Sequence, residues 1–442
     1  MQLCTARKWA KGLVQLKIHR PKINDMSISH LLAVVLVCLI ILKPHPVSNS
    51  QWISTFIGDL IIIGDITVSF FVLKRVRLNY GELRIMFVMI LTLIVISCGV
   101  VLSLIVNSRS DFMGGVFNVA RFLYYLLLIP VASYILGRAT LNFIFRLFDI
   151  LFFIVTSIVI AQLYPVPFVT DTVHLVYGTN KLRSLVTMSP RIYGTFMNPN
   201  FFAVFVVFMV GFHLFLGLAG KRLSYPGAVF RIVISLFLLF FSGSRMGFVG
   251  LVTMLLISVL FSRSAVYFSV VVFCLVLVIV FFFLLPSLGI KSIGLTARRF
   301  STMFDLIKAS DILEEESLGG RIREWGRSKE LIESAPLFGY GDSSTVDNGF
   351  VALIHRFGIV GAVFFFFFFL YSIWIGFRRH LSEGRNLNQT NILFISFSAA
   401  LLVMSLAAEL FFATQVFSLW LLSLILVLRE PLELDFVEGL RK

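Results

Sequence analysis

The sequence predicts an all-α polytopic integral membrane protein with about 12 transmembrane helices and two large outer loops. The first observation is composition, because 58% of the 442 residues are hydrophobic and only 14% are charged. The second is that apolar runs of about 20 residues recur along the chain, the length with which a helix crosses roughly 30 Å of hydrocarbon. The third is that basic residues gather in alternate connections between these runs, as in proteins that cross a membrane repeatedly.

The apolar runs give the predicted helices in chain order. They are residues 28–43, 52–73, 85–105, 115–137, 147–165, 199–219, 227–241, 246–262, 265–287, 347–376, 391–410 and 412–428. This transmembrane helical domain, 28–428, stands between a basic N-terminal segment, 1–27, and a tail, 429–442. The connections 166–198 and 288–346 are the two large loops, and loops of such length are usually functional.

The distribution of charge orients the helices. More than half of the 38 basic residues fall on the side that holds both chain ends, so the positive-inside rule places both termini in the cytoplasm. The net charge of +15 is therefore assigned to topology, and no nucleic-acid partner is expected.

No cleavable signal peptide is expected, because the basic N-terminal segment is long. The four cysteines show no metal-ligand spacing, so no metal or other cofactor is expected.

A polar stretch directly before an apolar run is the first candidate site. In "RIYGTFMNPN", residues 191–200, Asn198 precedes Pro199, and asparagine followed by proline predicts a capped helix start. Arg191 and Thr195 lie close by in the sequence, and a helix N-terminus beside an arginine is a ready site for an anion. The residues themselves leave a simple cap and a ligand site equally open.

The second candidate is "SGSR" at residues 242–245, which interrupts an apolar region. Arg245 falls at the outer junction of two short predicted spans. An arginine at or within the membrane is costly and usually faces a polar cavity, although its long side chain can also reach the interface. The neighbouring serine and glycine residues permit close helix approach, and they favour a functional role for Arg245.

The third candidate begins in the loop 288–346. Its apolar periodicity predicts an amphipathic helix near the membrane surface, stopped by Pro336 and the glycines that follow. Arg321 and Trp325 lie four residues apart on this helix. The loop is therefore expected to place an arginine and an aromatic side chain at the outer surface.

A carboxylate and an imidazole follow this loop. Asp347 and His355 are expected on one helical face, about 12 Å apart along the helix axis. Taken singly, the two are more typical of a helix-end carboxylate and a buried histidine. Together with three arginine-bearing elements on the same outer side, they indicate group transfer. Arginines stabilise a dianionic leaving group, and a carboxylate or imidazole takes a proton from an attacking hydroxyl.

Several segments, in this order, resemble the O-antigen polymerase and ligase family of bacterial envelope glycosyltransferases. They are "GTFMNPNFFA" at 194–203, "SGSRMG" at 242–247, Arg321 with Trp325, "FGYG" at 338–341 and "DNGFVALIHRFGIVG" at 347–361. The resemblance implies transfer of glycan chains from undecaprenyl-diphosphate-linked oligosaccharide at the periplasmic face of the bacterial inner membrane. It implies no metal and no nucleotide sugar, and it makes the two large loops periplasmic.

The resemblance also implies roles for single residues. Arg245 and Arg321 look like the arginines that hold the donor diphosphate, with Arg191 a further candidate. The other expected substrate-binding residues are Thr195, Asn198, Asn200, Ser244, Trp325 and Asn348. Ligases of the family typically show His-Asn where this chain shows Asp347 and Asn348. This departure favours a polymerase and leaves the general base open between Asp347 and His355.

Other functions stay open at this stage. A ligase would transfer the glycan to lipid A-core, and a lipid-linked oligosaccharide flippase would have a similar number of spans. A flippase would use charges inside the spans, the clear ones being Asp59, Asp65, Arg121, Asp149 and Glu409. The six phenylalanines at 364–369 are expected instead to face lipid. The expected partners are the lipid bilayer and the lipid-linked oligosaccharide, and a chain-length regulator protein is a further candidate.

Overall fold

The computed structural model describes the chain in segments. They are residues 23–43, 60, 63–64, 66–67, 78–106, 111–163, 176, 191–196, 198–262, 268–269, 271–273, 275–277, 280, 316–341, 347–382 and 389–428. Every regular element among these residues is a helix, and none of them forms a strand, which confirms the all-α prediction. The tail 429–442, most of the loop 166–198 and the first part of the loop 288–346 lie outside the described residues.

Apart from α14, which lies in the predicted loop 288–346, the helices follow the predicted apolar runs. They are α2 (Ile23–Ile41), α4 (Tyr80–Val106), α5 (Phe112–Arg138), α6 (Leu141–Leu163), α9 (Pro199–Phe212), the π-helix η1 (His213–Ala219), α10 (Tyr225–Ser242), α11 (Arg245–Ser262), α14 (Glu316–Ser334), α15 (Gly349–Ser382), α16 (Gln389–Met404), the 3-10 helix η4 (Leu410–Phe412) and α17 (Thr414–Leu428). The predicted runs 52–73 and 265–287 lie largely outside the described residues.

Several of these helices are candidates to span a membrane by their length and apolar composition. Six stretches are long and apolar enough: α4, α5, α6, α9 with η1, α10 and α15. Four shorter apolar helices lie in α2, α11, α16 and α17. These helices agree with a polytopic membrane protein, while the number of about 12 spans stays a prediction.

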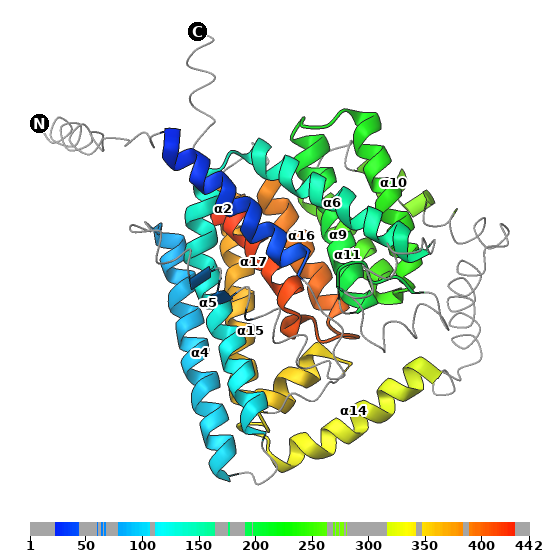
Figure 1. Cartoon of the computed structure of the whole chain (residues 1–442). Helices are drawn as coiled ribbons and strands as arrows, with labels where there is room; N and C mark the ends of the chain where they lie inside the picture. Colours follow the sequence, from blue (N-terminus) through cyan, green and yellow to red (C-terminus); the bar gives the residue numbers. More distant parts are fainter. Residues whose placement is uncertain are drawn as a thin grey trace, which may run out of the picture.

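α17 lies at the centre of the helix bundle, and every one of its residues is buried. It packs against α5 and α16, and further contacts reach α2, α9 and α15. Figure 1 shows α4, α5 and α15 on one side of this centre and α6, α9, α10 and α11 on the other. The Trp420 ring stacks on Phe369 at 4.5 Å, and its Nε1 donates to Ser398 Oγ at 2.8 Å.

The expectation that the phenylalanines at 364–369 face lipid is wrong for half of the run. Phe365, Phe368 and Phe369 are wholly buried, whereas Phe367 is 53% exposed. Consecutive helical residues point in different directions, so one face of α15 packs into the core while another faces outward. The run therefore supplies core aromatics as well as a lipid-facing surface.

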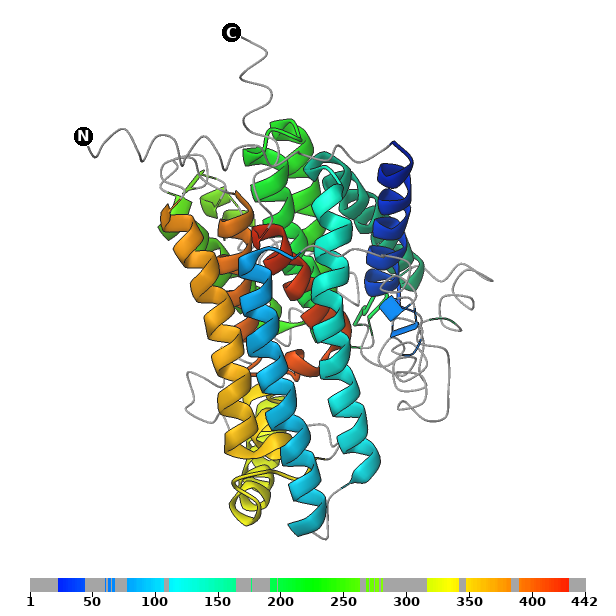
Figure 2. The same cartoon turned by 90° about the vertical axis from the view of Figure 1, so that its left-hand side faces the viewer.

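α14 lies across one end of the bundle, as both views show (Figures 1 and 2). It ends at Ser334, two residues before Pro336, which confirms the predicted amphipathic helix and its stop signal. We call this the α14 end of the bundle. α15 begins at this end, and α16 returns to it, because the Gly349 N–H donates to the Ser405 carbonyl at 2.7 Å.

α15 is broken at Gly358, where φ is 65° and ψ is −177°. The segment 336–341, which follows α14, runs past the break and pairs with the backbone groups that it releases. The pairs are Tyr340 N–H to His355 O, Gly341 N–H to Arg356 O, Ile359 N–H to Pro336 O and Val360 N–H to Leu337 O. Unpaired backbone groups are costly at membrane depth, so this segment stabilises the broken helix and fixes the position of the chain after α14.

Candidate functional site

The starts of α9 and α11 meet through a cluster of polar side chains, which we call the Arg191 cluster (Arg191, Asn200, Ser242 and Ser244). Arg191 Nε donates to the Ser242 carbonyl at 3.0 Å, and its Nη2 donates to Asn200 Oδ1 at 3.3 Å. Ser244 Oγ donates to the same Asn200 oxygen at 2.9 Å. Gly243 adopts a φ of 60°, and a Cβ there would lie 3.3 Å from Arg191 Nε. The first two sequence motifs therefore lie together in one polar cluster.

Helix caps explain part of this arrangement. Asn198 Oδ1 accepts from the Asn200 N–H at 2.8 Å, with Pro199 as the first residue of α9, which confirms the predicted cap. Ser244 Oγ accepts from the Gly247 N–H at 3.2 Å at the start of α11. The N–H groups at a helix start carry partial positive charge. Two such starts therefore lie together beside Arg191.

Thr195 is wholly buried and donates to the Ile41 carbonyl at 2.6 Å. Gln415 Nε2 donates to the carbonyls of Thr195 and Ile41, both at 3.3 Å. Gln162 Oε1 accepts from the Gly194 N–H at 3.0 Å. These contacts anchor the chain before α9 to α2, α6 and α17. Thr195 therefore has a structural contact here, and its role in substrate binding stays a prediction.

The other two predicted arginines, Arg245 and Arg321, lie on α11 and α14. Arg245 is the first residue of α11, directly after Ser244, and it is partly exposed. Arg321 lies in α14, one helical turn before Trp325. Trp325 is half-buried, and its Nε1 has no hydrogen-bond partner among the described residues. A buried donor without a partner calls for an explanation, and a bound ligand would supply one.

The expectation that Asp347 and His355 share a helical face is wrong, because α15 begins at Gly349, after Asp347. Asn348 Oδ1 accepts from the N–H groups of Phe350 and Val351 at 2.9 and 3.2 Å, and so caps the helix. Asp347 is exposed, whereas His355 is 3% exposed. The His355 ring packs edge-on against Tyr340 at 5.5 Å. The two candidate bases therefore occupy different environments.

The end of α16 and the turn that follows it, residues 405–413, contact α11 and α15. A Cβ on Gly250 of α11 would meet the Met404 side chain, and Gly349 of α15 is packed against the Ala408 carbonyl. α11 therefore packs against the end of α16, and the start of α15 packs against the turn that follows it. The stretches 191–200 and 242–245 are thus in direct contact, and that they share one site with Asp347 and Asn348 stays a prediction.

Sequence reasoning missed an ion pair in this region. Arg356 Nη2 lies 2.6 Å from Glu409 Oε2, and the guanidinium carbon lies 4.1 Å from the centre of the Phe412 ring. Glu409 was expected as an intramembrane charge, and Arg356 was not singled out. The sequence shows each of the two as a charge inside an apolar run. It does not show that they pair, because they are 53 residues apart.

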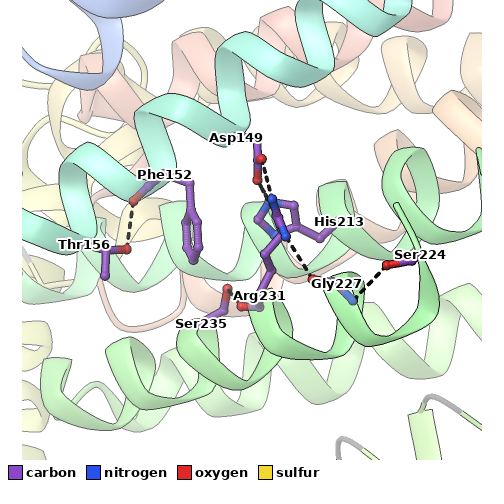
Figure 3. Close-up of polar contacts among 8 residues, drawn as sticks. All are labelled: Asp149, Phe152, Thr156, His213, Ser224, Gly227, Arg231 and Ser235. Atoms are coloured by element: carbon purple, nitrogen blue, oxygen red, sulfur yellow. Dashed lines mark hydrogen bonds and ion pairs between the residues drawn. The ribbon is translucent and has the colours of Figure 1, made fainter. Parts of the chain in front are cut away.

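A second polar cluster joins α6, η1 and α10 (Figure 3). Asp149 of α6 accepts from Arg231 of α10 at 2.6 and 2.7 Å. His213 Nε2 lies 3.2 Å from the same carboxylate, and the histidine is wholly buried among phenylalanine rings that include Phe152. Asp149, expected as a charge inside a span, is therefore paired.

Comparison with known families agrees with the motifs. Residues 230–366 match a family model described as O-antigen ligase. This span contains Arg245, Arg321, Trp325, Asp347 and His355, and it excludes the stretch 191–200. No curated protein matches the chain. The match confirms the resemblance to the O-antigen polymerase and ligase family and, with the apolar helices, supports a multi-pass membrane protein of envelope polysaccharide assembly.

Proposed function

Because residues 230–366 match the O-antigen ligase family, we propose that this protein polymerises undecaprenyl-diphosphate-linked oligosaccharide repeat units into O-antigen or a related surface polysaccharide. The observation that carries the proposal is the Arg191 cluster, which joins two helix starts directly beside Arg245. Such an arrangement suits an anion with several oxygen atoms. The diphosphate of the lipid-linked donor is an anion of this kind.

The proposed reaction is an inverting glycosyl transfer without a metal. A hydroxyl at the non-reducing end of one repeat unit attacks the anomeric carbon of the growing chain. The bond between this carbon and the diphosphate oxygen breaks, and the electron pair leaves with undecaprenyl diphosphate. The proton of the hydroxyl passes to a general base. Negative charge grows on the leaving group, where positive groups lower the barrier most.

The arginines act on the leaving group in this proposal. Arg245 and Arg321 hold the diphosphate, and Arg191 adds positive charge from a position fixed by Ser242 and Asn200. Ser244 orients Asn200 by its hydrogen bond. The Trp325 indole N–H, which has no partner among the described residues, donates to the diphosphate or to a sugar hydroxyl.

Asp347 is the better placed of the two candidate bases. Its carboxylate is exposed at the start of α15, where an acceptor hydroxyl can reach it, while His355 is almost wholly buried beside Tyr340. Asn348 caps the helix and fixes the backbone next to this carboxylate. We assign the general base to Asp347 and keep His355 as the alternative.

A ligase is the second candidate function, and the description of the matching family favours it. Asp347 stands where ligases of the family typically carry histidine, which supports the polymerase. A flippase has less support, because Asp149 and Glu409 are paired with Arg231 and Arg356. Asp59 and Asp65 lie outside the described residues.

The proposal places the α14 end at the periplasmic face of the inner membrane and both termini in the cytoplasm, following the charge distribution. The chain-length regulator stays a prediction. A test in cells replaces Arg245 or Arg321 by alanine and compares both with Arg84→Ala. Arg84 is a matched arginine near the start of α4, where it stacks on Tyr80.

Both site variants should lose surface polymer, while Arg84→Ala should keep it, with equal amounts of protein in the membrane. The polymer is read on a gel of cell-surface glycan, and the protein on an immunoblot. Wild-type polymer length in Arg245→Ala and Arg321→Ala would disprove the assignment.

A further inference from the structure

Arg356 lies at the break in α15 and connects three parts of the molecule. Its carbonyl oxygen accepts from the Gly341 N–H at 2.8 Å, and the neighbouring His355 carbonyl accepts from the Tyr340 N–H at 2.8 Å. These bonds attach the segment 336–341 to α15. Only Ala335 separates this segment from Ser334, the last residue of α14. The position of α14 therefore depends on the break.

The Arg356 side chain reaches in the other direction, to the turn 405–413. It pairs with Glu409 at 2.6 Å and lies over the Phe412 ring at 4.1 Å. The exposed fractions of the two charged side chains are 4% and 13%. Charges in such surroundings are stable only when paired, and removal of one partner leaves the other uncompensated. The pair therefore holds the broken part of α15 against the turn.

The segment 336–341 also contacts α4 and α5. Ser103 Oγ of α4 donates to the Gly339 carbonyl at 2.7 Å, and Asn118 Nδ2 of α5 lies 3.5 Å from the Gly341 carbonyl. Ser103 is only 2% exposed. A residue at this position would therefore become accessible if the segment moved away from α4.

We propose that Arg356 is a positioning residue that holds the segment 336–341, and with it α14, in place at the α14 end. The turn 405–413 anchors Arg356 through Glu409, and the backbone of Arg356 anchors the segment. The proposal rests on the proposed function in one respect, because α14 carries Arg321 and Trp325 toward the donor. Loss of the ion pair would release α14 without altering Arg245 or the Arg191 cluster.

The test measures the position of the segment and the activity separately. In a chain whose four native cysteines are replaced by serine, Ser103→Cys is exposed to a membrane-impermeant maleimide. Arg356→Gln and Glu409→Gln should each raise the labelling rate about tenfold through local opening. Arg356→Lys, which keeps the charge, should label at nearly the rate of the parent. The labelling rate reports the position of the segment 336–341 whether or not the protein is active.

The same variants are assayed with purified lipid-linked repeat units. Arg356→Gln should raise the KM for the donor about tenfold, because α14 no longer places its donor contacts, and Arg356→Lys should restore it. Unchanged labelling in Arg356→Gln and Glu409→Gln would overturn the proposal. Absence of folded protein in both variants, judged by size-exclusion chromatography, would make the pair a stability element alone and would also overturn it.

Arg245→Ala serves as the matched control. It should abolish polymer while leaving the labelling of Ser103→Cys unchanged. If Arg245→Ala keeps full activity, the proposed donor site fails, whatever the labelling shows. If Arg245→Ala is inactive but Arg356→Gln labels like the parent, the positioning role fails and the donor site stands.

Discussion

Glycine is the only residue type that fits the break in α15, so we expect Gly358→Ala to destabilise the protein. A Cβ at this position would collide with the Leu337 carbonyl and the Phe338 nitrogen, and a side chain with this combination of φ and ψ costs about 1–3 kcal/mol. The segment 336–341 would have to lift, which breaks up to four backbone hydrogen bonds, each contributing about 0.5–1.5 kcal/mol. The combined loss is on the order of 5 kcal/mol.

Gly137→Ala is the matched control, because a Cβ on this glycine near the end of α5 meets nothing within 4 Å. Alanine inside a helix is favoured over glycine by about 1 kcal/mol, so this variant should melt no lower than the parent. Gly358→Ala should melt at least about 5 °C lower in detergent and should lose its polymer ladder. Equal melting temperatures and ladders in both variants would refute the reasoning about the break.

Three further predictions concern other parts of the site. Asn200→Leu removes the oxygen that accepts from Arg191, so polymer formation should fall at least about tenfold on a gel, with unchanged protein level; an unaltered ladder would remove Asn200 from the site. Asp347→Asn should lower kcat at least about 100-fold, and His355→Gln much less; the reverse order would identify the histidine as the base. Asp149→Asn should lower the melting temperature by leaving its cationic partner uncompensated, while KM for the donor stays unchanged; a raised KM would place this cluster in the donor site.

Local signals in the sequence predicted much of the fold. Asn198 before Pro199 predicted the start of α9, and Pro336 predicted the end of α14. Both signals depend on residues that are close in sequence, because a cap or a stop acts within one helical turn. The apolar runs predicted helices for the same reason, since a membrane span must be continuous and about 20 residues long.

Contacts between distant residues could not be predicted in the same way. Arg356 and Glu409 are each recognisable as charges in apolar surroundings, but nothing in either stretch shows that they pair. The break at Gly358 is equally hidden, because glycine is common in membrane helices and the segment that fills the break belongs to another part of the chain. The start of α15 after Asp347 separated the two candidate bases that helical periodicity had placed together.

The proposed polymerase activity can be measured directly with the purified protein in lipid vesicles. The protein is supplied with undecaprenyl-diphosphate-linked repeat units and a chelator, without lipid A-core, and the products are resolved on a gel. The proposal predicts a ladder of polymer for the parent protein and none for Arg245→Ala. Transfer that occurs only when lipid A-core is added would contradict the polymerase and establish a ligase, and movement of the donor between leaflets without any product would establish a flippase.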